Sequence, residues 1–172
     1  MKSNSRQSGF SLLELTVTTA ILALVAVASM TLVRTSYTAW RRHDDDQSQR
    51  QEAAAVLRHI CRHVRQARGV MAISTAADNS GTLSLLMPNG QTFIWDHDGG
   101  TGRVNFGIGT ASSLLASGIE ELNFRGLKLD GVTQTTEVGM IHSILCTVRF
   151  NLMRPSGAEQ ITVSSQAWLR AW

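Results

Sequence analysis

The sequence predicts an α+β fold in which a long N-terminal helix packs on an antiparallel β-sheet. Residues 10–68 contain neither glycine nor proline, so nothing in that stretch interrupts a helix. After Gly69, short segments of alternating apolar and polar residues are separated by turn signals, which is typical of antiparallel strands. The chain has 172 residues, 43% hydrophobic and 17% charged, which is enough for a buried core. A helix followed by a run of strands is the order of an α+β domain.

The first part of this helix is apolar, and its only charged residue between positions 10 and 33 is Glu14. At about 1.5 Å per residue the segment spans roughly 36 Å, enough to cross a hydrocarbon core of about 30 Å. The preceding residues 1–9 are polar and basic. We therefore expect a transmembrane helix over residues 10–33.

A secretory signal peptide is the alternative interpretation of this N-terminus. Ala26-Val27-Ala28 before Ser29 supplies an A-x-A cleavage site, and cleavage there would release a soluble binding domain. Two features disfavour it. The apolar run continues past Ala28, and a carboxylate such as Glu14 costs about 2.5–3.5 kcal/mol inside a membrane helix, where charges are functional by default.

Residues 9–17, Gly-Phe-Ser-Leu-Leu-Glu-Leu-Thr-Val, resemble the class III signal of type IV prepilins and type II secretion pseudopilins. The resemblance implies a pilin-like fold and a leader peptide over residues 1–9. It implies that a membrane-embedded prepilin peptidase cuts between Gly9 and Phe10 and methylates the new amino terminus. It also implies that Glu14 pairs with the amino terminus of a neighbouring subunit and sets axial register during assembly.

The same resemblance implies a location and a set of partners. The chain would be a single-pass protein of the bacterial inner membrane, with a cytoplasmic N-terminus and a periplasmic C-terminal domain, that later enters a fibre. Its partners would be other minor and major pseudopilins or pilins, the prepilin peptidase and the inner-membrane assembly platform. Charge alone does not give this orientation, because Lys2 and Arg6 face Arg34, Arg41 and Arg42 across the apolar segment.

Residues 34–68 are expected to continue as an amphipathic helix, with Gly69 as its C-terminal stop. Arg58, Arg62 and Arg65 fall mostly on the side opposite a stripe of apolar residues. The stripe recurs at spacings of three and four and predicts one buried face, made of Ala53, Val56, Leu57, Ile60, Val64 and Ala67.

Residues 69–172 predict a β-rich globular domain. Candidate strands cover residues 82–87, 91–95, 103–106, 121–125, 144–152 and 160–169, and Pro88-Asn89-Gly90 and Pro155-Ser156-Gly157 mark two turns. The clearest strand is 144–152, in which every second residue is apolar. Its expected inward-facing residues are Ile144, Cys146, Val148, Phe150 and Leu152.

Within the pilin family, the pattern after the helix most resembles J-type minor pseudopilins and related minor pilins. The resemblance lies in the arginine-rich helix end at 57–68, the sequence Gly-Ile-Glu-Glu-Leu-Asn-Phe at 118–124, and the final strands, which end in Trp168-Leu169-Arg170. This implies a minor subunit of a short fibre or of its initiating tip. The sequence does not decide whether the subunit belongs to a type II secretion system, a type IV pilus or a competence pilus.

No metal or cofactor site is predicted. His59 and His63 have the spacing of a metal pair, but Arg58 and Arg62 flank them and no third ligand is evident, so we expect a solvated helix edge. Residues 96–102 resemble half of a calcium loop without its bidentate glutamate, and we expect an ordinary loop. His43 with the acidic run 44–46 is expected to form a charged collar where the helix leaves the bilayer.

The two cysteines, Cys61 and Cys146, leave two possibilities open. If the strand that holds Cys146 packs on the helix that holds Cys61, the thiols could meet and form a disulfide in an oxidising periplasm. Two separate buried thiols are the favoured interpretation, because a sequence does not fix the distance that a disulfide requires.

The sequence carries no recognisable catalytic signature. It lacks a G-x-S-x-G elbow, a Walker loop and an HExxH motif, so we predict a structural subunit and disfavour a membrane-tethered periplasmic enzyme. The formal net charge of +3 is scattered and forms no basic stripe interleaved with aromatic residues. Nucleic-acid binding is therefore not supported.

Overall fold

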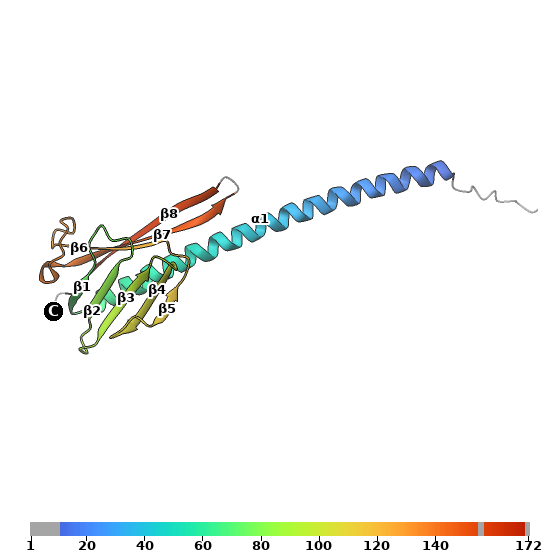
Figure 1. Ribbon diagram of the computed structural model, residues 1–172. Coiled ribbons are helices and arrows are strands. Elements are labelled where there is room, and N and C mark those ends of the chain that lie inside the picture. Colours follow the sequence, from blue (N-terminus) through green and yellow to red (C-terminus); the bar gives the residue numbers. More distant parts are fainter. Residues whose placement is uncertain (1–10, 155–156, 171–172) are drawn as a thin grey trace, which may run out of the picture. The chain divides into compact units, whose positions relative to one another are not determined.

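The computed structural model describes residues 11–154 and 157–170 (Figure 1). The elements in chain order are α1 (Leu12–Gln66), β1 (Gly69–Ile73), β2 (Thr82–Leu86), β3 (Thr92–Asp98), β4 (Arg103–Ile108), β5 (Ser113–Ala116), β6 (Glu121–Leu127), the 3₁₀ turn η1 (Val138–Met140), β7 (Ser143–Arg154) and β8 (Gly157–Trp168). The chain divides into two compact units, Met1–Asp45 and Asp46–Trp172.

The second unit contains two antiparallel sheets in which neighbouring strands follow one another along the chain. The first sheet has the order β1-β2-β3-β4-β5 and the second the order β6-β7-β8. The turn predicted at Pro88-Asn89-Gly90 joins β2 to β3, which pair antiparallel, and Gly90 has a φ of +81° that favours glycine. The long hairpin of β7 and β8 pairs Ser143 with Trp168 at one end and Arg154 with Gly157 at the other.

The two sheets are joined where the loop between β1 and β2 meets β6. The Gly81 N–H donates to the carbonyl of Leu122 at 2.8 Å, and the Leu122 N–H donates to the carbonyl of Asn79 at 2.9 Å. The Asn123 side-chain amide donates to the carbonyls of Ala76 and Asp78, each at 2.8 Å. A Cβ on Gly81 would lie 2.6 Å from the Leu122 carbonyl oxygen, so this junction requires glycine.

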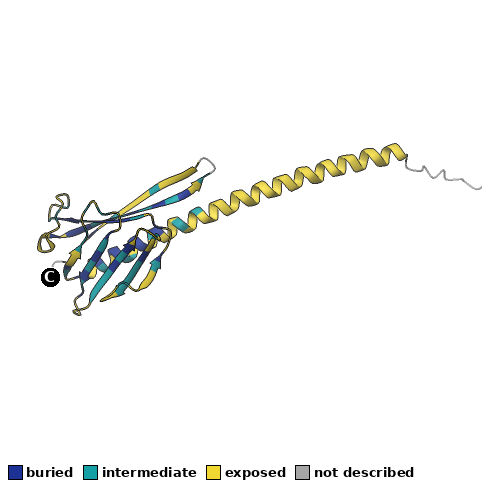
Figure 2. Ribbon diagram, in the orientation of Figure 1, coloured by how far each residue is buried: buried dark blue, intermediate teal, exposed yellow. Residues whose placement is uncertain are grey.

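The core of this unit lies between the last part of α1 and the inner faces of both sheets (Figure 2). The predicted helix stripe is confirmed, since all six of its residues are buried. The alternation predicted for 144–152 is confirmed as well, with its five apolar residues buried in β7. From the first sheet, Leu83, Leu85, Trp95 and Val104 belong to the same core. The expected α+β, pilin-like class is thus confirmed.

Two local predictions were wrong. The helix ends at Gln66, and Gly69 opens β1 because the Arg68 N–H already donates to the Leu86 carbonyl at 2.8 Å. Residues 96–98 belong to β3, where Asp96 pairs with Asn105, so only the residues after Asp98 form a turn. The strands β1 and β5 were missed. They are the edge strands of the first sheet, and each buries a single residue, so neither shows clear alternation.

Candidate functional site

Glu14 lies in the first turn of α1. The Ser11 carbonyl starts the helix by accepting the N–H of Glu14 at 2.9 Å and that of Leu15 at 3.1 Å. A carboxylate is favoured there, because the N-terminus of a helix carries partial positive charge. Gly9 and Phe10, the predicted cleavage and methylation positions, lie outside the described residues.

The apolar part of α1 is exposed on every side. Every residue from position 12 to position 33 is exposed, and Leu22, Leu24 and Leu32 each expose about 70% of their surface (72%, 74% and 69%) (Figure 2). The helix is long and apolar enough to cross a membrane. Since an apolar helix surface of this extent is not stable in water, lipid or other apolar helices must cover it.

The threonines of this segment satisfy their hydroxyl groups within the helix itself. Thr16 donates to the Leu13 carbonyl at 2.9 Å, Thr18 to the Glu14 carbonyl at 2.8 Å, and Thr31 to the Ala28 carbonyl at 2.8 Å. Such bonds to the preceding turn remove unpaired donors, which would be costly in hydrocarbon. Within the described residues of this segment, the Glu14 carboxylate is therefore the one charged group that would enter an apolar environment.

The Glu14 carboxylate has no ion-pair or hydrogen-bond partner within the part of the chain that the structure describes. A charge at the centre of a membrane helix costs about 2.5–3.5 kcal/mol on insertion scales. The nearest described arginine along the helix is Arg34, which is about 30 Å away at 1.5 Å per residue. A compensating cation must therefore come from outside the described residues of this chain.

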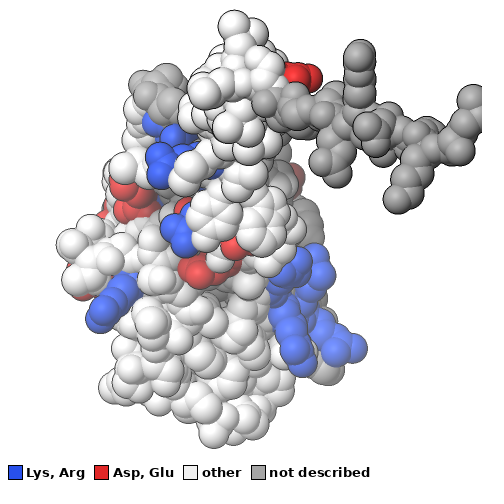
Figure 3. Space-filling model, turned by 90° about the vertical axis from the view of Figure 1, so that its right-hand side faces the viewer, with Lys and Arg blue, Asp and Glu red and all other residues white. Residues whose placement is uncertain are grey.

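In the second unit an ion-pair cluster connects α1 to the end of the β7–β8 hairpin. Figure 3 shows basic and acidic side chains next to one another on one face of the molecule. The Arg154 guanidinium contacts Asp46 of the helix and also lies 2.7 Å from Glu159 of β8. These two carboxylates raise the pKa of Arg154. Sequence reasoning missed this cluster, because the pairing of positions 46 and 154 appears only after the sheets have formed.

His59 and His63 do not form the solvated edge that was expected. Both are half-buried and pack against an aromatic group of the first sheet, made of Phe93, Trp95 and Phe106. The Trp95 indole N–H donates to His59 Nδ1 at 3.2 Å, and His63 Nδ1 is buried without a partner. Burial, reinforced by the charge of Arg62, lowers the pKa of both histidines. The aromatic residues Phe93 and Trp95, at alternate positions of the candidate strand 91–95, were the signal in the sequence that could have indicated this packing.

Among the described residues, no group of three or more His, Cys, Asp or Glu side chains could hold a metal ion. In residues 96–102, which were expected to form an ordinary loop, the Asp98 carboxylate accepts hydrogen bonds from its own turn. It accepts the Thr101 hydroxyl at 2.7 Å and the Gly100 N–H at 2.9 Å, and these bonds lower its pKa.

Cys61 and Cys146 are both buried and carry free thiols in the structure. The Cys61 Sγ donates to the hydroxyl of Ser165 at 3.3 Å, and Ser165 is the cross-strand partner of Cys146. The helix thiol therefore lies beside the strand pair that holds the other thiol. Burial raises the pKa of the Cys146 thiol well above its usual value, with a smaller contribution from Cys61.

Comparison with known proteins identifies the N-terminal segment. Residues 4–30 match the family model described as the prokaryotic N-terminal methylation motif. No curated protein and no solved structure is significantly similar to the chain. The match covers Glu14 and most of the apolar segment, whose residues 12–33 lie in one exposed helix. The chain thus carries, over residues 4–30, the N-terminal methylation motif that is the class III signal of the type IV pilin family.

Proposed function

We propose that this chain is a minor pseudopilin or minor pilin, a structural subunit of a type II secretion pseudopilus or a type IV pilus-like fibre. The methylation motif at 4–30, set on a helix whose exposed apolar surface contains one unpaired carboxylate, carries the proposal. In this account residues 1–9 are a leader, residues 10–33 are the membrane and filament-core helix, and residues 34–68 continue it. Residues 69–172 form the periplasmic domain.

Cleavage between Gly9 and Phe10 supplies the positively charged partner that the Glu14 carboxylate lacks. The cut creates a positive amino group on Phe10, and methylation leaves that nitrogen basic. An ammonium and a carboxylate are each poorly tolerated alone in a low-dielectric environment, whereas a close pair of the two is much less costly. Pairing Glu14 of one subunit with the amino terminus of the next therefore favours one axial register in the growing fibre.

The J-type assignment has its support in the second unit. The arginine-studded helix end, the phrase at 118–124 and the final strand pair are the features that resemble this group. The subunit would assemble with other minor and major pseudopilins after processing by the prepilin peptidase, on an inner-membrane platform. A place at the initiating tip of a short fibre is the role that this resemblance favours.

Substitution of Glu14 tests the assembly role. In the host cell, Glu14→Ala should leave removal of residues 1–9 intact, because the cut lies at another position, and should lower incorporation into sheared fibres about tenfold or more. The matched control is Glu52→Ala, which removes an exposed carboxylate from the same helix outside the apolar segment. Normal incorporation of Glu14→Ala would show that the carboxylate has no part in assembly. A soluble protein that begins at Ser29 would instead support the secreted-domain alternative.

A further inference from the structure

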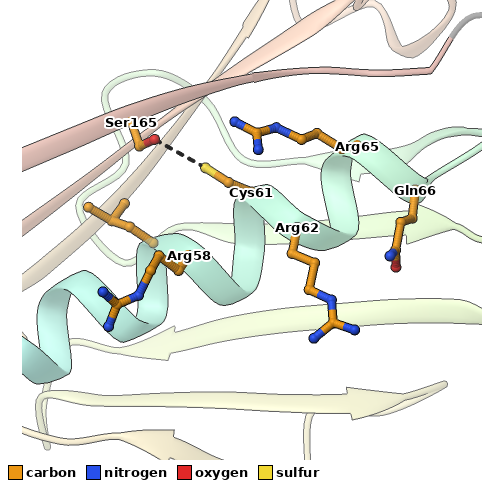
Figure 4. Close-up of a pocket in the computed structure, with 7 residues that line it drawn as sticks. Arg58, Cys61, Arg62, Arg65, Gln66 and Ser165 are labelled. Carbon is orange, nitrogen blue, oxygen red and sulfur yellow. Dashed lines mark hydrogen bonds between the residues drawn. The ribbon is translucent and has the colours of Figure 1, made fainter.

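An open groove of about 330 Å³ lies in the second unit beside the C-terminal part of α1 (Figure 4). We call it the arginine groove, and its lining residues are Leu57, Arg58, Cys61, Arg62, Arg65, Gln66 and Ser165. All but Ser165, which belongs to β8, come from the helix. Figure 4 shows Arg65 extending toward β8 beside Cys61, whereas Arg62, on the preceding turn, extends to the side of the helix away from Ser165.

The positive charge of this groove is not compensated within the described residues. Arg58, Arg62 and Arg65 are all exposed, and the ion pairs of the described residues involve other arginines. The field of Arg62 reaches the neighbouring histidines, whose pKa values it lowers together with burial. Three like charges within two helix turns repel one another, so a negatively charged ligand that enters the groove is attracted.

The strand that borders the groove has a free edge. Among the described strands, β8 pairs only with β7 over its twelve residues. The Leu169 N–H donates to the His142 carbonyl, and because bonding alternates along antiparallel strands, Ser164 directs its backbone N–H to the free edge. The only charged residue of β8 is Glu159, and proline is absent from its described residues. Soluble proteins usually protect long edges with charges or proline, so an unprotected one favours pairing with a further strand.

We propose that an extended acidic segment of a different pilin-like subunit adds to β8 as a fourth strand and places its carboxylates against Arg58, Arg62 and Arg65. The proposal rests on the function proposed above, and it defines the partner by its chemistry. Backbone hydrogen bonds to the β8 edge supply affinity, and the arginine groove selects a partner strand with acidic side chains.

The spacing of the arginines fits such a strand. Arg58 and Arg62 are separated along the helix axis by about 6 Å at 1.5 Å per residue. Side chains on one face of a strand recur about every 6.7 Å. On an added strand that runs along the helix axis, two carboxylates at alternate positions would therefore match the axial separation of Arg58 and Arg62, and guanidinium–carboxylate bonds of this kind are charge-assisted.

Charge argues against a second copy of this chain as the occupant. Pairing of two β8 edges about a two-fold axis would bring two arginine rows together, and like charges across an interface are unfavourable. The acidic run of the chain itself, Asp44, Asp45 and Asp46, lies within α1 and is not available as a strand. The occupant is therefore a different chain.

Photo-crosslinking in the host cell tests the proposal on the full-length protein. Benzoylphenylalanine is introduced in place of Ser164, at the free edge, and in place of Leu114 on the outer strand β5 as a control position. Crosslinked peptides are then sequenced by mass spectrometry, and the N-terminus of the same sample is determined. We expect an adduct at position 164 with another chain that carries the methylation motif, through a segment with carboxylates at alternate positions.

Charge reversal provides the second arm. The combined substitutions Arg58→Glu, Arg62→Glu and Arg65→Glu should lower the yield of this adduct about tenfold or more, whereas Arg50→Glu, at another exposed site on the helix, should leave it unchanged. Tryptophan fluorescence confirms that each variant is folded.

The outcomes separate this proposal from the proposed function. An adduct with a second copy of this chain, one through a segment without carboxylates, or one that survives charge reversal would overturn the groove proposal. If a chain correctly processed at Phe10 gave no adduct, the groove proposal would also be overturned, and the proposed function would stand. A chain that is not processed at Phe10 would overturn both.

Discussion

Replacement of Ile60 by alanine measures how strongly the helix is held by the two sheets. The Ile60 side chain is fully buried at the centre of the helix stripe. The substitution removes three carbon atoms, which at about 0.8 kcal/mol per buried methylene accounts for roughly 2.4 kcal/mol. The cavity left between helix and sheets adds to this, and we expect a total loss of about 2–5 kcal/mol in the free energy of unfolding.

The matched control is the same substitution elsewhere on the same helix. Ile21 is 58% exposed in the apolar segment, so Ile21→Ala should change the stability of the second unit by less than about 0.5 kcal/mol. The assay is urea unfolding of the detergent-solubilised chain, followed by tryptophan fluorescence, to which the fully buried Trp95 contributes. If Ile60→Ala cost no more than Ile21→Ala, the packing of α1 on the sheets described here would be wrong.

Three further predictions concern the second unit. Because burial lowers the pKa of His59 and His63, the unfolded chain takes up protons first as the pH falls below about 6.5. The contribution of the two neutral histidines to the free energy of unfolding is complete above that pH and is lost as the pH falls through their lower pKa values in the folded state. Urea midpoints that stay constant from about pH 8 to 5 would disprove this. Gly81→Ala should lower stability by about 1–3 kcal/mol, because its Cβ would meet backbone, whereas Gly69→Ala, with open space around it, should not. Both buried thiols should resist iodoacetamide in the native protein and react in denaturant without a reductant, and an intact mass lower by two hydrogens would reveal a disulfide instead.

The parts of the fold with strong periodicity could be predicted from the sequence. The helix stripe around Ile60 repeats over four turns, and the alternation of β7 continues over nine residues, so each specifies one buried face by itself. Edge strands such as β1 and β5 bury too little to show a period. The end of the helix before Gly69 could not be predicted from the sequence either, because the hydrogen bond from the Arg68 N–H to the Leu86 carbonyl depends on a strand that is distant in sequence.

The candidate site divides in the same way. Glu14 could be identified because a lone carboxylate in an apolar run is conspicuous in any sequence. The environment of His59 could not, since the aromatic residues that cover it, Trp95 and Phe106, are 36 and 47 positions away and are brought together only by the pairing of β3 with β4. The arginine groove likewise depends on where β8 lies. Its residues were recognised as the polar side of the helix, but not as one wall of a groove.

Determination of the mature N-terminus tests the central claim most directly. The protein is extracted from host membranes, and its intact mass and N-terminal peptide are measured. We predict a chain that begins at Phe10 and carries one methyl group on its amino nitrogen. A chain that begins at Ser29, or one that retains residues 1–9, would contradict the account of the leader, the membrane helix and the role of Glu14.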